Sequence, residues 1–429
     1  ATDLIRSIRQ SYQGERSKQV LAQTTQAIYE GAIQTALQLH QSSQDTRYLN
    51  QAFQFAESNK AILLLESMND NWAKGVGGIP NELLQQEKAL RIDIAFYEKT
   101  IREEKQKGKS ADKAKIKSWE KQWFSSKNQY QELIADFEQN YPKYHQLKYQ
   151  TDLITVAEVQ EQLLTPQSAL LEYFLGEEEV YLFCISQSGI QLWAQPWDAL
   201  TQQHLQGLRD ILQYPPQSAN FKTQFEQFNQ QANALYELLL AQPLATLDSA
   251  VQQLIIVPDG QLAYLPFDLL LTSPSTTTTV NYRPEALAYL FEDFSISYSY
   301  SSTLLQQNTH RPKESAPKNL VAYAPSFHSL VVGSREACTF NELYSLRCNQ
   351  GEVKSICQLF DGKAQLATKA NKSTFAAEAK QYQVIHLATH ACADEADARL
   401  NRIFFTDDYL SSNDLYNLQL QADLVVLSA

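Results

Sequence analysis

The pattern of hydrophobic and polar positions changes character near residue 150. Before that point, apolar residues recur at steps of three and four, which is the period of an amphipathic helix. Residues 21–39 and 48–68 each predict one such helix, and residues 82–106 and 112–139 predict two longer, charge-rich helices. We interpret the longer pair as an antiparallel helical hairpin with a solvated outer face, turning near Gly108.

Residues 1–150 therefore form the first predicted domain, an all-α region. Within it, residues 52–61 resemble a helix of the tetratricopeptide type, but the period of about 34 residues that defines such an array does not recur. The glycine-rich segment 75–80 interrupts the helical pattern, and Asn81 can cap the helix that follows. The basic run at 105–117 is either a binding patch or, more commonly for such runs, a solvated hairpin tip.

Residues 151–429 form the second predicted domain, in which strand patterns alternate with helical patterns. The strand patterns are short apolar runs at 169–174, 180–185, 190–194, 254–257, 294–300, 320–323, 384–389 and 424–427. Helical patterns separate them at 202–213, 221–240 and 352–360. This alternation predicts an α/β fold with a largely parallel sheet flanked by helices. In such folds the chemistry usually lies at the carboxyl ends of the strands.

Charge and composition exclude several classes of protein. The formal net charge is −12 and the pI is near 5.2, which argues against a direct nucleic-acid binder. No apolar run approaches the ~18 residues of a membrane span, and the N-terminus lacks an apolar secretory core. The five cysteines are an odd number without the spacing of a disulfide framework, which favours a cytoplasmic protein. The absence of an initiator Met indicates a segment of a longer protein.

Four short motifs in the second domain carry a resemblance to a known family. They are LIIVPDG at 254–260, LPF at 265–267, HLATHA at 386–391 and LVVLSA at 424–429. Together they resemble the CHAT domain, a caspase-like family of clan CD cysteine peptidases that often follows tetratricopeptide repeats. The resemblance covers roughly residues 156–429. It implies a caspase-like fold and a thiol protease activity that needs no cofactor and no metal.

The resemblance also implies which residues carry the chemistry. His390, at the exit of the strand at 384–389, matches the general base of the family. Ala391 follows where the family often has Gly, and its backbone N–H is expected to help form the oxyanion hole. The nucleophilic cysteine is expected directly after Ala429, so the chain up to Ala429 should be inactive by itself. We also expect His390 to lie close to the C-terminal end of the chain, across adjacent parallel strands.

Neighbouring residues have other interpretations. His390 itself could be a hydrogen-bonded structural histidine, although the two terminal motifs together favour the base. His386 is the better structural candidate, because four strand residues place it about 13 Å from His390. That spacing also argues against a metal site, since His-x-x-x-His chelates from a helix. Cys392 could act as the nucleophile only if its loop folded back onto His390.

We therefore predict a cysteine endopeptidase that cleaves a protein substrate under the control of a regulatory protein docked on the helical region. The alternative is an inactive pseudo-protease that serves as a protein-interaction scaffold. The sequence does not predict the substrate preference. Ser428 stands where clan members that cleave after basic residues often carry Asp. The loop acids Asp394, Glu395 and Asp397 could replace it, or could simply be solvated.

Overall fold

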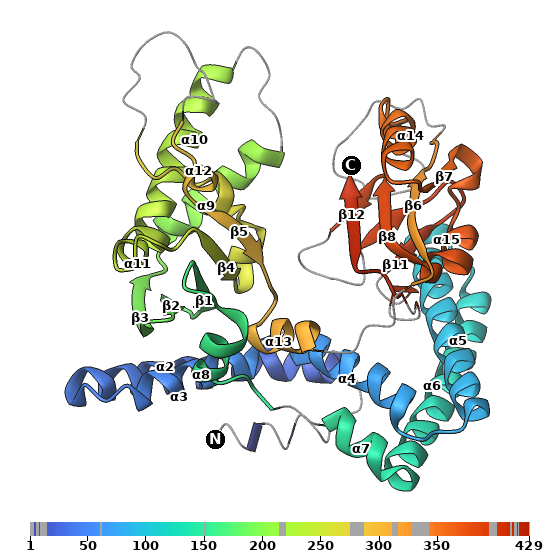
Figure 1. The fold of residues 1–429 in the computed structure, drawn as a ribbon. Helices are drawn as coiled ribbons and strands as arrows, with labels where there is room; N and C mark the ends of the chain where they lie inside the picture. The colour runs from blue at the N-terminus through green and yellow to red at the C-terminus, as the bar shows by residue number, and fades with distance from the viewer. Residues whose placement is uncertain are drawn as a thin grey trace. The chain divides into compact units, whose positions relative to one another are not determined.

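The chain forms two compact units, each assembled from two separate stretches of sequence. The computed structural model describes residues 4–5, 8, 15–60, 62–149, 152–213, 220–274, 287–310, 316–327, 343–393, 401–411, 414–415, 418 and 420–428. The first unit contains residues 1–77 and 143–311, and the second contains residues 78–142 and 312–429. Each unit thus joins helices from the N-terminal third of the chain to an α/β part (Figure 1).

The first unit is built around a five-stranded sheet of order β3-β2-β1-β4-β5. Its strands are β1 (Ser168–Leu175), β2 (Glu179–Ser186), β3 (Gly189–Pro196), β4 (Gln253–Val257) and β5 (Ser295–Tyr298). Its helices are α2 (Glu15–Ser43), α3 (Arg47–Asn59), α4 (Ile62–Val76), α7 (Pro142–Tyr149), α8 (Val156–Glu158), α9 (Ala199–Gln213), α10 (Phe221–Tyr236), α11 (Gln242–Ala245), α12 (Leu290–Asp293) and α13 (Ser302–His310). β1 pairs with β2, and β2 with β3, in antiparallel fashion, whereas β1, β4 and β5 are parallel.

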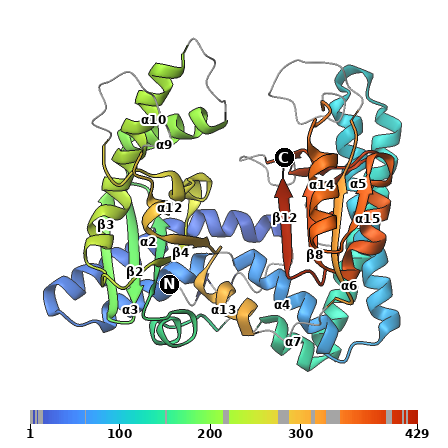
Figure 2. The same cartoon turned by 45° about the horizontal axis from the view of Figure 1, so that its top comes forward.

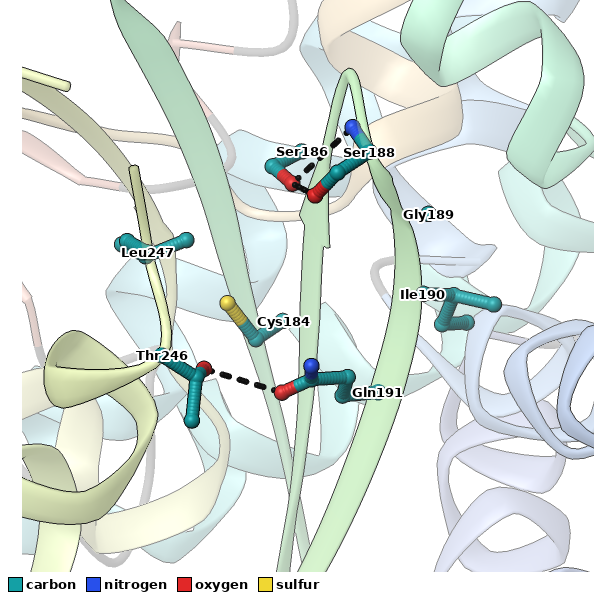
Figure 3. A pocket seen from close by; sticks show the side chains of 8 residues that line it. All are labelled: Cys184, Ser186, Ser188, Gly189, Ile190, Gln191, Thr246 and Leu247. Atoms are coloured by element: carbon teal, nitrogen blue, oxygen red, sulfur yellow. Dashed lines mark hydrogen bonds between the residues drawn. The ribbon is translucent and has the colours of Figure 1, made fainter. Parts of the chain in front are cut away.

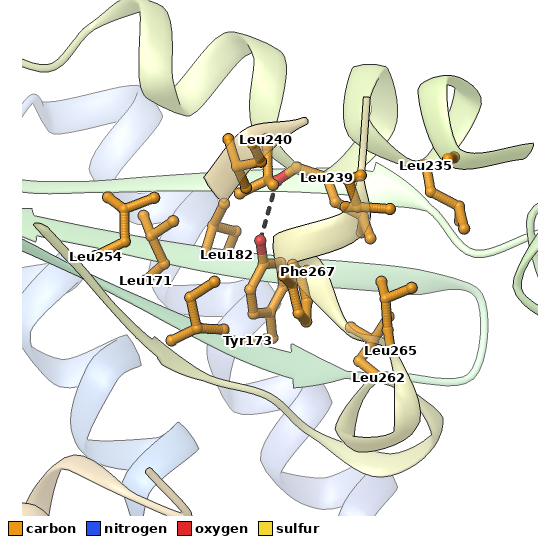
Figure 4. Close-up of a cluster of buried hydrophobic side chains, with 14 of the residues drawn as sticks. Leu171, Tyr173, Leu182, Leu235, Leu239, Leu240, Leu254, Leu262, Leu265 and Phe267 are labelled. Atoms are coloured by element: carbon orange, nitrogen blue, oxygen red, sulfur yellow. Dashed lines mark hydrogen bonds between the residues drawn. The ribbon is translucent and has the colours of Figure 1, made fainter. Parts of the chain in front are cut away.

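Both faces of this sheet are covered, as the alternation of side chains along β1 shows. Leu171 and Tyr173 pack on one face with residues of α9 and α10, and the Tyr173 hydroxyl donates to Leu239 O at 3.2 Å (Figure 4). Leu170 and Phe174 pack on the other face with α2 and α3. Because successive strand residues face opposite sides, a strand covered on both faces reads as the continuous apolar run seen in the sequence.

The second unit is built around a four-stranded sheet of order β12-β8-β6-β7, in which every pair is parallel (Figures 1 and 2). These strands are β6 (Lys318–Ala324), β7 (Lys363–Leu366), β8 (Tyr382–Ala388) and β12 (Leu424–Ser428). Its helices are α5 (Asn81–Gln106), α6 (Lys113–Asn140), α14 (Asn349–Leu359) and α15 (Lys372–Glu378). A small antiparallel sheet follows β8 and contains β9 (Ala391–Cys392), β10 (Arg402–Phe404) and β11 (Tyr409–Ser411).

The predicted α/β class and the helical hairpin are confirmed. The hairpin helices α5 and α6 match the predicted ranges within one residue at each end, and Asp112 caps α6 by accepting from the backbone N–H groups of its first turn. The single helix predicted at 48–68 is wrong, because the chain breaks into α3 and α4 at Lys60. That residue has an extended backbone (φ −89°, ψ 139°), and its Nζ donates to Pro258 O at 3.2 Å. The cap position before α5 is held by Pro80, so Asn81 is the first helical residue instead.

The two compact units do not divide the chain near residue 150, where the sequence pattern changes. On α5, Lys99 Nζ binds both carboxylate oxygens of Asp408 (2.6 Å each), and Glu103 accepts from the Tyr409 hydroxyl (3.0 Å). The hairpin therefore belongs with the C-terminal strands, while α2 and α3 belong with the first sheet. The strands also form two separate larger sheets, although their pattern suggested one. Periodicity identifies a strand but not its partner, since pairing depends on distant segments.

A buried polar cluster ties α3 to the α/β part of the first unit. The Glu57 carboxylate of α3 accepts from the backbone N–H groups of Ser302 (3.0 Å) and Thr303 (2.8 Å) at the start of α13. Glu172 of β1 accepts from the Ser302 hydroxyl (2.6 Å). Burial raises the pKa of Glu172 well above its usual range, and the nearby Glu57 carboxylate raises it further. Burial therefore favours the protonated form of the Glu172 carboxyl.

Replacing Glu172 by Gln should remove a pH-dependent loss of stability. A carboxyl whose pKa is raised by folding contributes fully below its ordinary value of 4.5, and that contribution is lost as the pH rises through the raised value. We expect the urea midpoint of the wild type to fall relative to that of Glu172→Gln as the pH rises above 4.5. Glu161→Gln, at an exposed site of the same unit, is the matched control. A difference that stays constant with pH would contradict the prediction.

Candidate functional site

His390 leaves the second sheet at the carboxyl end of β8, beside the end of β12. The two strands are parallel neighbours, with Ser428 opposite Ala388. The backbone N–H of Thr389 donates to Ser428 O at 2.9 Å, so the pairing extends to the residue before His390. The predicted adjacency of these two strands is therefore confirmed. β8 pairs with β6 on its other side, which holds it between two neighbours.

The His390 imidazole is held by a hydrogen bond and two aromatic rings. Its Nε2 lies 2.7 Å from Tyr344 O. A carbonyl oxygen can only accept, so Nε2 carries a proton and, in the neutral ring, Nδ1 keeps its lone pair. The Tyr344 ring meets the imidazole edge-on at a centroid distance of 4.8 Å, and the Phe327 ring lies 5.1 Å away. Among the described residues, no hydrogen-bond partner is found for Nδ1.

The strand pairing of Ala391 fixes the direction of its backbone N–H. Ala391 lies opposite Ile403 in the antiparallel pair of β9 and β10. Phe404 N donates to His390 O at 3.0 Å, which makes Ala391 and Ile403 a pair of the non-hydrogen-bonded type. In such a pair the N–H groups point away from the partner strand. The exposed Ala391 therefore directs its N–H away from β10, and no described residue accepts from it.

Two buried side chains support the backbone around the candidate base. Thr389 Oγ1 donates to Phe404 O at 2.6 Å. Asn349, the first residue of α14, donates from Nδ2 to Pro325 O (3.0 Å) and to Ala388 O (3.3 Å). These carbonyls belong to the chain leaving β6 and to the last residue of β8. Asn349 thereby ties the carboxyl ends of the two strands together.

His386 has a different environment from His390. It is only 6% exposed, and its Nε2 lies 2.8 Å from a carboxylate oxygen of Glu352. Glu352 is in the first turn of α14, the helix that packs against β6 and β8. The contact joins this helix to the sheet, so the geometry assigns His386 a packing role.

The described cysteines offer no evident alternative nucleophile beside His390. Cys392 is engaged in a disulfide bond, so its thiol is not available to attack a substrate. The cysteine spacing did not predict this disulfide. Cys357 is buried, and burial raises its pKa. Cys348 is free and exposed before α14, but it forms no hydrogen bond with His390.

A small cavity in the first unit holds the remaining described cysteine. The cavity has a volume of about 80 Å³, and Cys184, Ser186, Gln191 and Thr246 are among the residues that line it (Figure 3). Thr246 Oγ1 donates to Gln191 Oε1 at 2.9 Å across it. Burial raises the pKa of the Cys184 thiol to about 12. The thiol is therefore protonated at neutral pH and a poor nucleophile.

Sequence reasoning missed three residues of this site, namely Phe327, Tyr344 and Asn349. Phe327 could have been found, because it follows the apolar run 320–323 and the carboxyl ends of parallel strands meet at one edge. Tyr344 and Asn349 carry no local signal. The loop acids at 394, 395 and 397 lie outside the described residues. Among the described residues, no group of three or more His, Cys, Asp or Glu could hold a metal ion.

Comparison with known proteins bears on the C-terminal part of the chain. The sequence model of the CHAT domain matches residues 229–429, a range that begins in α10 and includes His390. No curated protein matches the chain. Across the described residues, every helix is too short or too polar to span a lipid bilayer.

The two histidines should respond differently to truncation. His386→Ala leaves the Glu352 carboxylate without its partner and opens a cavity, so we expect the free energy of unfolding to fall by about 2–4 kcal/mol. His390→Ala removes a half-buried ring with one hydrogen bond to a carbonyl, and should cost about 1 kcal/mol. Urea unfolding at neutral pH measures both losses. Equal losses would contradict the assignment of His386 to packing and His390 to chemistry.

Proposed function

Residues 229–429 form a CHAT domain, a caspase-like domain, and on that premise we propose that the protein is a cysteine endopeptidase. The observation that carries the proposal is the register of β12 on β8, with Ser428 opposite Ala388. If the pairing continues, the residue after Ala429 comes opposite His390, at the spacing of adjacent strands, about 4.8 Å. A cysteine there is within reach of the imidazole.

Each group of the site then has a defined role. His390 Nδ1 takes the proton of the cysteine thiol, and the thiolate attacks the carbonyl carbon of the scissile peptide bond. The N–H of Ala391 donates to the oxyanion that forms. The imidazolium returns its proton to the leaving amine, and water then hydrolyses the thioester. Throughout, Tyr344 O accepts from Nε2–H and holds the orientation of the ring.

Regulation through the helical region has a physical route in the second unit. α5 binds Asp408 and Tyr409 on either side of the start of β11, through Lys99 and Glu103. β11 pairs with β10, where Phe404 O accepts from the Thr389 hydroxyl and Phe404 N donates to His390 O. A protein partner that shifts α5 would therefore act on His390 through this small sheet. The protease is proposed to be controlled in this way.

A version of the protein extended past Ala429 in its natural sequence tests the proposed activity. We expect a cysteine as the next residue, and cleavage of a dye-labelled unfolded protein. His390→Ala should lower kcat/KM by about 10³-fold or more, because the thiol loses its base. His310→Ala, an exposed histidine at the end of α13, is the control and should leave kcat/KM unchanged.

Other outcomes would overturn the proposal. A residue other than cysteine after Ala429, or no cleavage of any protein substrate, would favour the scaffold instead. Cleavage that survives His390→Ala would show that the base lies elsewhere. Cysteine-dependent cleavage by the chain ending at Ala429 would point to one of its own cysteines.

A further inference from the structure

The outer face of α6 carries a row of lysines beside an exposed aromatic ring. Lys113, Lys117 and Lys121 are spaced by four residues and so lie on one face of the helix, and Phe124 follows within a turn. All three lysines are exposed, and Phe124 is 60% exposed. Within the part of the chain that the structure describes, none of these lysines has an ion-pair partner. We define these four residues as the basic face.

The basic face is not used by the fold. The opposite side of α6 is the buried one and includes Leu133 and Phe137. Other lysines of the hairpin tip are engaged locally: Lys105 pairs with Glu120 across the hairpin at 2.7 Å, and Lys107 pairs with a Glu of α5 at 2.6 Å. The unpaired row is thus a feature that intramolecular contacts leave unexplained.

The hairpin region that carries the basic face is positively charged, whereas the chain as a whole is negatively charged. Residues 99–127 contain ten Lys and Arg against four Asp and Glu, a net charge of +6. The whole chain has a net charge of −12, so the remaining residues carry −18. A local cationic surface on an acidic protein attracts an anionic ligand small enough to feel mainly the local field.

We propose that the basic face binds an acidic amphipathic helix of a partner protein. Four helical residues rise about 6 Å, so carboxylates at i, i+4 and i+8 of a partner helix match the lysines one to one. An apolar residue of the same helix would cover the Phe124 ring, which otherwise remains in water. The inference rests on the proposed function, because it specifies the regulatory partner as an acidic helix. Binding needs no catalytic residue, so the binding test and the cleavage test can give opposite results.

A nucleic acid fits this surface less well. A polyanion extending beyond the hairpin would meet the negative remainder of the chain, whereas the three carboxylates of the acidic helix lie within about two helical turns. Exposed charges more than about 8 Å apart are largely screened at physiological salt, so the local cations dominate for the short ligand only. The row also consists of Lys without Arg, the residue that most often reads bases and stacks on them.

The binding test uses the chain itself and a fluorescent peptide helix of about 20 residues. The peptide has Glu at three successive i, i+4 positions and Leu three residues beyond the last Glu. We expect anisotropy titrations to show saturable binding that weakens with added salt. Lys117→Glu combined with Lys121→Glu should weaken binding about tenfold or more. Phe124→Ala should weaken it several-fold while leaving the salt dependence unchanged. The matched control is Lys354→Glu, an exposed lysine on α14, which should have no effect.

Each variant should remain folded, because the substituted side chains are exposed. Circular dichroism of each variant checks this. A peptide with Gln in place of Glu should not bind. Binding that is absent, or equal in the wild type and the double variant, would overturn the proposal. Tighter binding of a single-stranded oligonucleotide, lost in the same double variant, would assign the face to a nucleic acid instead.

Discussion

Parallel pairing of β8 with a neighbour on each side is the constraint on which the candidate site depends. In a parallel sheet the carboxyl ends of all strands lie at one edge. That edge receives Phe327 after β6, His390 after β8 and Ser428 at the end of β12. In an antiparallel pair, Ser428 would lie at the opposite end of β8 from His390. Asn349 then joins two of these strand ends through their carbonyls, which gives the edge a defined geometry.

The contacts that complete each unit join residues very far apart in sequence. Lys99 and Asp408 are separated by 309 positions, and Glu57 and Thr303 by 246. Residues 1–150 are consequently not a detachable module, because their helices contribute to both units. Removing them would expose the core face covered by α2 and α3 and would leave the Asp408 carboxylate without Lys99, one of its two lysine partners. A regulatory partner bound to the hairpin would instead act through contacts that already exist.

The polar contacts of the two units differ in their exposure to solvent. Glu57 and Glu172 lie in the interior, where burial penalises charge and each lone pair needs a donor. The Lys99–Asp408 pair is partly exposed, so solvent screens it and it contributes less to stability than its short distance suggests. The row of lysines on α6 is exposed to solvent, where charge costs little to maintain. It is therefore free to serve a partner without a penalty to the fold.

The sequence by itself determined the elements that local chemistry controls. Helical period, charge and the turn at Gly108 predicted the α5–α6 hairpin, and two apolar runs predicted β8 and β12 with His390 at a strand exit. These features depend on residues within one or two turns of each other. Only the tertiary structure decided how the strands divide into two sheets, why the helix breaks at Lys60, and which groups surround His390. Lys60 is held by Pro258, and the imidazole by Tyr344 and Phe327. Such contacts join distant segments and leave no periodic trace in either one, so no local pattern could have revealed them.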